Sequence, residues 1–167
     1  MEKPVLRRDL KENTQTLLKT ISYFSADKFN TVPPNGGWSA AQVCQHLILV
    51  DGGAVRLLTA EGREIDRKPG DKIPVFKKRM HDFETKMNAT DPITPDGNPK
   101  DKEQMLGMLQ DIRQRMTSLI EAKDLTKLVV TFEHPFFGAL TRLEWIVFSI
   151  HHSQRHIYQL KKIASAI

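Results

Sequence analysis

The chain has 167 residues, of which 40% are hydrophobic and 27% are charged, a composition typical of a globular domain with a sizeable core. No apolar run approaches the ~20 residues that a membrane span requires, and the charged N-terminus lacks the apolar segment of a secretory signal. Cys44 is the single cysteine, which excludes an internal disulfide. We therefore expect one domain over residues 1–167, a cytoplasmic location and no membrane partner.

The formal net charge of +5 arises from 25 basic and 20 acidic residues that are interspersed along the chain. Nucleic-acid-binding proteins typically gather Lys and Arg into dense patches, and no such block interleaved with aromatic residues occurs here. The pattern favours a solvated surface and no nucleic-acid partner. The positive charge would also suit an anionic small-molecule substrate.

The first predicted helix extends from about Val5 to Ser25, because apolar residues recur there at helical spacing. Its buried stripe is predicted to comprise Leu6, Leu10, Leu17, Leu18, Ile21 and Phe24. A break rich in proline and glycine at residues 32–37 separates this helix from the next.

The second predicted helix begins after Ser39, whose side chain can cap the helix while Gln42 completes a capping box. Its apolar stripe consists of Val43, Leu47, Val50, Ala54, Leu57 and Leu58. His46 projects into the middle of this stripe, so its ring is expected in the core.

A long connection is predicted for residues 61–99, which are polar and rich in proline and glycine. It contains at most one short helix, near Val75–Met87. The third helix is predicted to begin near Asn98–Pro99, a cap followed by a proline suited to the first turn. Its stripe consists of Met105, Leu109, Ile112, Met116, Leu119 and Ile120.

Residues 128–132 are β-prone but have no evident partner, so extended chain or a very short strand is expected. The fourth helix begins after Thr141, with Glu144 completing a second capping box. Its buried face is expected to carry Trp145, Phe148, Ser149, His152, His156, Gln159, Leu160 and Ile163. Four long amphipathic helices with one long crossover between the second and third predict an all-α four-helix bundle.

Three of the six histidines are predicted to converge in the core. His152 and His156 lie four residues apart on the fourth helix, so their rings leave the same face one turn apart. With His46 they form a plausible site for Zn²⁺, Ni²⁺ or Fe²⁺ with at least one open coordination position, which is typical of catalytic centres. Three independent core histidines are the alternative, although each unpaired buried ring would cost ~1–3 kcal/mol.

The remaining candidates receive more ordinary interpretations. His81, His134 and His151 are predicted to be surface or loop residues. Gln159, one turn beyond His156, could orient a ligand ring or contact substrate, or could be a buried polar residue. Cys44 is predicted to act as a small buried hydrophobic residue.

Several residue groups occur in a recognisable order: Trp38-Ser39, His46-Leu47, His134-Pro135-Phe136-Phe137-Gly138-x-Leu140-Thr141-x-x-Glu144-Trp145, and His152-x-x-x-His156-x-x-Gln159. In order and spacing they resemble the DinB-like family over nearly the whole chain. That family includes proteins described as metal-dependent hydrolases.

The resemblance implies a four-helix bundle with up-down-down-up connectivity, and a homodimer. It also implies a metal ion, often zinc or nickel, held by residues of the second and fourth helices, at positions that correspond here to His46, His152 and His156. The His134-Pro135 loop is expected to pack beside the bundle without binding metal. Characterised members include bacillithiol and mycothiol S-transferases and a mycothiol-dependent maleylpyruvate isomerase, which implies a low-molecular-weight thiol as co-substrate.

Three functions follow as hypotheses. The first is a metal-dependent S-transferase that makes a thiolate near neutral pH for attack on a small electrophile. The second is a metal-dependent hydrolase with a metal-activated water, although no carboxylate lies on the histidine stripe and Asp51 is rotated about 140° from His46. The third is a non-catalytic metal-binding stress or interaction module.

Overall fold

The computed structural model describes all residues, 1–167, and consists mainly of helices. Four long helices form a bundle: α1 (Lys3–Ser22), α3 (Ala40–Thr59), α5 (Lys102–Ala122) and α6 (Arg142–Ala166). Shorter elements lie in the connections: α2 (Ala26–Phe29), α4 (Ile73–Met80), β1 (Gly62–Arg63) and β2 (Leu128–Val129). No helix combines the length and the apolar character that crossing a membrane would require.

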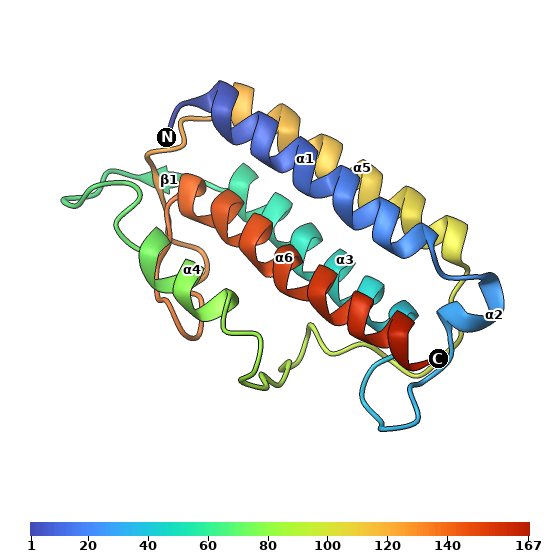
Figure 1. Ribbon diagram of the computed structural model, residues 1–167. Coiled ribbons are helices and arrows are strands. Elements are labelled where there is room, and N and C mark those ends of the chain that lie inside the picture. Colours follow the sequence, from blue (N-terminus) through green and yellow to red (C-terminus); the bar gives the residue numbers. More distant parts are fainter.

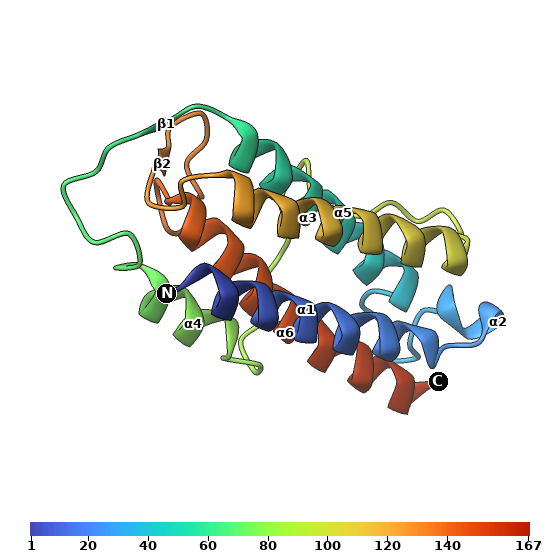
Figure 2. The ribbon, with the colours of Figure 1, turned by 90° about the horizontal axis from the view of Figure 1, so that it is seen from above.

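The four long helices follow an up-down-down-up order. Helices α1 and α6 run in one direction and α3 and α5 run in the other (Figure 1). Each helix packs against two neighbours, α1 and α3 both lying against α5 and α6, as a second view also shows (Figure 2). The predicted four-helix bundle is confirmed, and the long crossover joins the parallel helices α3 and α5.

Both predicted capping boxes are present. The Ser39 hydroxyl accepts from the Gln42 backbone N–H, and the Gln42 side chain accepts from the Ser39 N–H. Thr141 and Glu144 repeat the arrangement at the start of α6. These bonds satisfy backbone donors that have no partner within the helix, so the sequence places the starts of α3 and α6 correctly.

Two predicted boundaries of the long helices are wrong. Helix α1 ends at Ser22, and the one-turn helix α2 follows it. Helix α5 begins at Lys102, where the Asp101 carboxylate accepts from the Gln104 N–H at 2.7 Å. The expected start at Asn98–Pro99 fails because Asp101 supplies a charged cap closer to the apolar stripe.

The connection between α3 and α5 holds more structure than expected. Its short helix, α4, ends at Met80 and not near Met87. Strand β2 has a partner after all, because Gly62–Arg63 pairs with it in antiparallel register. A Cβ on Gly62 would lie 2.6 Å from the Lys127 Cβ, so only glycine permits this approach.

The bundle core consists of two apolar clusters, one toward each end. On every long helix, apolar residues that belong to different clusters stand seven positions apart: Leu10 and Leu17, Leu47 and Ala54, Leu109 and Met116, and Ile150 and Ile157. Seven residues are close to two helical turns. The gap between the clusters is therefore at one height on all four helices.

Polar side chains fill this gap. We call Asn13, Asp51, Arg113 and Ser153 the polar layer; all four are buried. Arg113 donates to the Asp51 carboxylate at 2.8 Å and to the Asn13 Oδ1 at 2.9 Å, and Ser153 donates to the same Asn13 oxygen at 2.6 Å. One hydrogen-bonded network thus joins all four helices in mid-bundle, directly beside the histidines of α6.

Candidate metal centre

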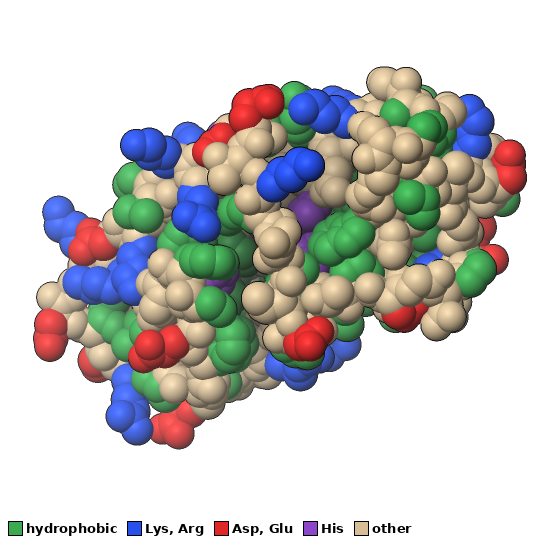
Figure 3. Space-filling model, turned by 90° about the horizontal axis from the view of Figure 1, so that it is seen from below, with side chains coloured by type: hydrophobic (Ala, Val, Ile, Leu, Met, Phe, Trp, Pro, Cys, Tyr) green, Lys and Arg blue, Asp and Glu red, His purple; other side chains and the backbone are tan.

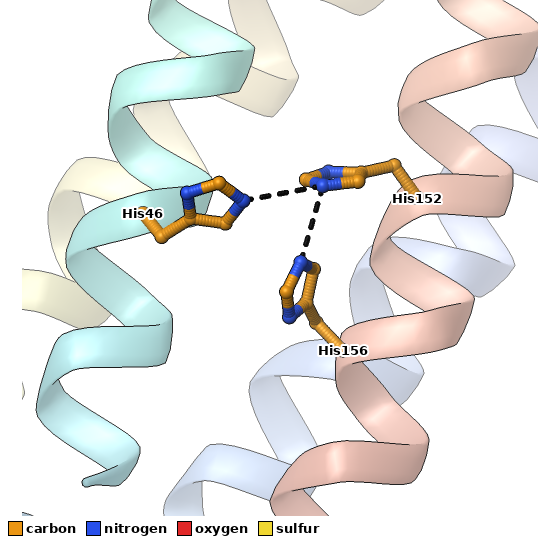
Figure 4. A group of neighbouring side chains, drawn as sticks. All are labelled: His46, His152 and His156. Carbon is orange, nitrogen blue, oxygen red and sulfur yellow. Dashed lines mark hydrogen bonds between the residues drawn. The ribbon is translucent and has the colours of Figure 1, made fainter. Parts of the chain in front are cut away.

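Three buried histidines from α3 and α6 point toward one another. The Nε2 atom of His152 lies 3.2 Å from Nε2 of His46 and 3.1 Å from Nε2 of His156 (Figure 4). His46, His152 and His156 expose only 4%, 8% and 7% of their surface. The structure therefore brings together all three residues that the sequence analysis selected, each offering a ligand atom within 4.8 Å of the others.

The tautomers of two rings follow from their outer partners. His46 Nδ1 lies 2.8 Å from the backbone carbonyl of Ile93, and His156 Nδ1 lies 2.8 Å from Oε1 of Gln159. Carbonyl oxygens only accept hydrogen bonds, so each Nδ1 carries the proton and donates it. In a neutral ring the Nε2 atom then has a free lone pair, and in both residues this lone pair faces His152.

Burial keeps the three rings neutral. Desolvation lowers the pKa of His46, lowers that of His156 to about 3, and holds that of His152 well below its ordinary value. The positive charge that His46 would carry also opposes protonation of His152 and His156. Metal ions bind neutral imidazole, so the electrostatic environment suits them.

Hydrogen bonding within the cluster does not satisfy it. A proton on His152 Nε2 can serve only one of the two lone pairs well, and the buried His152 Nδ1 has no partner. A cation at the centre would be shared by all three Nε2 atoms. The donor set, three neutral nitrogens with no carboxylate, matches Zn²⁺, Ni²⁺ or Fe²⁺ and not Mg²⁺ or Ca²⁺. These residues fit a divalent transition metal.

Two aromatic rings flank the cluster. The Trp38 ring lies 5.0 Å from the His46 ring and stacks near His156 at 6.5 Å, and Phe148 stacks on His152 at 5.3 Å. On the face turned toward the bottom of Figure 1, histidine surface is visible within recesses bordered by hydrophobic side chains (Figure 3). The walls of the site are apolar, and its interior is nitrogen-rich.

The two buried acids, Asp51 and Glu144, are each paired with an arginine. Asp51 is fully buried and paired with Arg113 in the polar layer. Glu144 is buried too and accepts from both terminal nitrogens of Arg67 at 2.6 and 2.7 Å. Neither carboxylate is free to act as a base at the histidines.

The other candidates lie where ordinary roles explain them. Cys44 is buried, and desolvation raises the pKa of its thiol well above the usual value, so it stays protonated. His134 packs half-buried against Phe137 and Phe148. His81 and His151, however, lie together with Gln154 in a cluster that the sequence analysis missed.

One atom of the site and one residue of the adjacent polar layer escaped the sequence analysis. The Ile93 carbonyl belongs to the connection, where no side-chain pattern marks a backbone acceptor. Arg113 stands between Leu109 and Met116 on the apolar stripe of α5, and this placement among core positions could have revealed it.

Fold and site together define a four-helix bundle with three histidines buried between antiparallel helices. The DinB superfamily matches residues 9–160, most of the chain, and the chain belongs to this superfamily. A Bacillus subtilis (strain 168) relative, the uncharacterized protein YuaE, is 28% identical over 143 residues, which cover 86% of this chain and 87% of YuaE.

Two solved structures share the fold. YfiT from Bacillus subtilis, described as a probable metal-dependent hydrolase with an unusual four-helix bundle topology, matches with a TM-score of 0.64 at 20% identity, over 98% of this chain and 86% of YfiT. The four-helix bundle protein TT2238 matches with a TM-score of 0.59 at 18% identity, over 98% of this chain and 99% of TT2238. At these identities the likeness establishes the fold alone.

Proposed function

We propose that this protein is a metal-dependent enzyme that transfers a low-molecular-weight thiol to a small electrophilic substrate. The observation that carries the proposal is the convergence of three buried imidazoles: the Nε2 atoms of His46 and His156 lie 3.2 and 3.1 Å from Nε2 of His152, with no carboxylate among them. Three nitrogen ligands leave a coordination position open, as catalytic sites require. Zinc or nickel is the expected ion, and iron the next candidate.

A divalent ion held there would stabilise the anion of a thiol and so supply a thiolate near neutral pH. The protein contributes rigidity: the Ile93 carbonyl and Gln159 fix the orientation of two rings, as outer hydrogen bonds commonly do for metal ligands. Trp38 and Phe148 exclude water from one side of the rings, which strengthens electrostatic interactions inside.

Thiol activation suits this site because it needs no separate base. A thiol has an ordinary pKa of about 8.5, so modest stabilisation of its anion suffices at neutral pH. Hydrolysis usually also draws on an acid or base near the reacting atoms, and Asp51 and Glu144 are tied to Arg113 and Arg67.

A metal-dependent hydrolase is the second candidate. It is favoured by the description of YfiT, whose fold this chain shares, as a probable metal-dependent hydrolase. The same three histidines would hold the ion in either reaction, so the two candidates differ in the substrate that occupies the open position and not in the ligands.

Metal content comes first in testing the proposal. Protein purified without a histidine tag is analysed by elemental mass spectrometry beside His152→Ala and beside His134→Asn, a histidine variant outside the site. We expect a Zn, Ni or Fe ion that His152→Ala lacks and His134→Asn retains. Equal metal in all three proteins would refute the ligand assignment, and circular dichroism confirms that each variant is folded.

Activity assays then separate the functions. The metal-loaded protein is incubated with a chromogenic electrophile and a panel of thiols, and separately with ester and amide substrates. Conjugation that requires both metal and thiol supports the transferase, and hydrolysis without thiol supports the second candidate. Metal binding with neither activity would overturn the enzymatic proposal in favour of a metal-binding stress or interaction protein. The expected homodimer is part of the proposal, and light scattering during gel filtration tests it.

A further inference from the structure

A second group of potential ligand atoms lies on the outer side of α6. His81 Nε2, His151 Nδ1 and Gln154 Oε1 are separated by 3.1, 2.8 and 2.8 Å. These separations resemble those between the Nε2 atoms of the buried cluster. His81 comes from the end of α4, whereas His151 and Gln154 stand three residues apart on α6, so the group closes a long-range contact.

The turn that carries His81 is firmly held against α6. Asp82 accepts hydrogen bonds from the backbone N–H groups of Glu84 and Thr85. Arg155 of α6 donates to the carbonyls of Asp82 and Thr85. The Phe83 ring stacks on Tyr158 with a centroid separation of 4.5 Å. His81 is thus positioned by its neighbours on both sides and not only by the imidazole contact itself.

The tautomers that a metal would need are available. The Gln154 oxygen can accept an N–H from each ring, which accounts for the arrangement without an ion. The other ring nitrogens, His81 Nδ1 and His151 Nε2, have no hydrogen bond to the protein. Each neutral ring can therefore hold its single proton on that nitrogen. Both lone pairs then face the Gln154 oxygen, giving two nitrogens and one oxygen around one point, a set suited to zinc or copper.

Access and charge also bear on this group. His81 is exposed, and His151 and Gln154 are half-buried. His151 and Gln154 line a cavity of about 400 Å³ between α1 and α6, whose carboxylates, Asp9 and Glu12, are paired with Arg8. Lys77 is close enough to lower the pKa of His151, after the larger effect of burial, and its charge opposes a cation. We therefore expect weaker binding here than at the buried histidines.

We propose that His81, His151 and Gln154 form a second, solvent-accessible site for a divalent transition ion, with Zn²⁺ as the probe. His151 and His152 are consecutive, so two neighbouring imidazoles of α6 serve two separate sites. An ion here would fasten the turn at residues 81–85 to α6. That turn continues into the segment whose Ile93 carbonyl orients His46. An ion at the second site would therefore restrain the segment that holds His46 in the buried site.

Binding stoichiometry tests this proposal. Zn²⁺ binding is measured by equilibrium dialysis with elemental analysis for the parent, His81→Ala, His152→Ala and the double variant. We expect two ions per chain in the parent, one in each single variant and none in the double variant. In the parent, the ion held by His81 should bind more weakly than the ion held by His152. Equal numbers of bound ions in the parent and in His81→Ala would overturn the second site. Loss of an ion in His81→Ala alone would support it even if the buried site failed to bind.

Replacement of Gln154 distinguishes a metal ligand from a purely structural residue, because the Zn²⁺ affinity should depend on the oxygen at this position. Gln154→Leu removes the oxygen and should weaken the second ion, whereas Gln154→Glu supplies a carboxylate and should bind it more tightly than the parent. His134→Asn serves as the control and should leave both ions in place. Equal Zn²⁺ affinity for Gln154→Leu and Gln154→Glu would exclude Gln154 as a ligand and overturn the site as proposed.

Discussion

His152 and Ser153 follow one another in α6 but belong to different networks. The His152 Nε2 faces His46 and His156, whereas the Ser153 hydroxyl donates to Asn13 at 2.6 Å. Helix α6 therefore presents the candidate metal ligands on one face and contributes Ser153 to the polar layer from the adjacent face.

The buried ion pair of the polar layer should be costly to break from one side. Arg113→Met leaves the Asp51 carboxylate buried without its partner, which we expect to lower the free energy of unfolding by about 3–5 kcal/mol. Urea denaturation measures the loss. Arg115→Met, an exposed substitution on the same helix, should change stability little.

The corresponding double substitution should recover much of that loss. In Asp51→Leu/Arg113→Met no buried charge is left without a partner, and apolar replacements of buried ion pairs are often neutral or stabilising. The summed cost of Asp51→Leu and Arg113→Met should therefore exceed the cost of the double variant. A strictly additive double-mutant cycle would contradict the direct pairing of these residues.

Gln159 should support metal affinity without being a ligand. Gln159→Leu removes the acceptor that orients the His156 ring, and loss of such a partner typically costs ~10–100-fold in metal affinity. Competition with a chromophoric chelator measures the effect on Zn²⁺. Gln114→Leu, an exposed change on α5, is the matched control and should retain the parent affinity.

Stability should fall in acid partly through Glu144. Burial would raise the pKa of this carboxyl, but hydrogen bonds from Arg67, Thr141 and Lys72 hold it below its ordinary value. A lowered pKa in the folded state stabilises the protein above the unfolded pKa, and the contribution is lost as pH falls through the folded pKa. Glu144→Gln should thus cost about 2 kcal/mol at pH 7.

The pH dependence separates this effect from a general loss of packing. Urea unfolding measured between pH 3 and pH 7 should show the gap between parent and Glu144→Gln narrowing as the pH decreases. Glu133→Gln replaces an exposed glutamate and should follow the parent. A gap that stays constant across this range would argue against ionisation of Glu144 as its source.

Trp38 should report on occupation of the buried site. Its ring lies 5.0 Å from His46, whereas the other tryptophan, Trp145, packs with Phe132 and Phe148. Ni²⁺ binding should therefore quench mainly the Trp38 fluorescence, and Trp38→Phe should abolish most of the quenching. Trp145→Phe should preserve it, and quenching that survives unchanged in Trp38→Phe would place the bound Ni²⁺ elsewhere.

Periodicity and capping chemistry account for what could be predicted from the sequence. His46, His152 and His156 were found because each stands on an apolar stripe, where a polar ring requires an explanation. Ser39 and Thr141 marked helix starts because their partners lie three residues on. These signals are local, so a single sequence contains them.

The missed features depend on contacts between distant segments. Gly62–Arg63 is too short and polar to be recognised as a strand before its partner at Leu128–Val129 is known. The Ile93 carbonyl carries no side-chain signature at all. His81 and His151 each looked like an isolated surface residue, because 70 residues separate them.

The polar layer has a consequence for how the helices are aligned lengthwise. Shifting α5 along α3 by one turn would move the Arg113 guanidinium about 5.4 Å from Asp51 and leave two buried charges without their partners. Apolar side chains alone would tolerate such sliding better, because one leucine resembles the next. The Asp51–Arg113 ion pair therefore favours a single axial alignment of α3 and α5. The same alignment fixes the height at which His46 of α3 meets the histidines of α6.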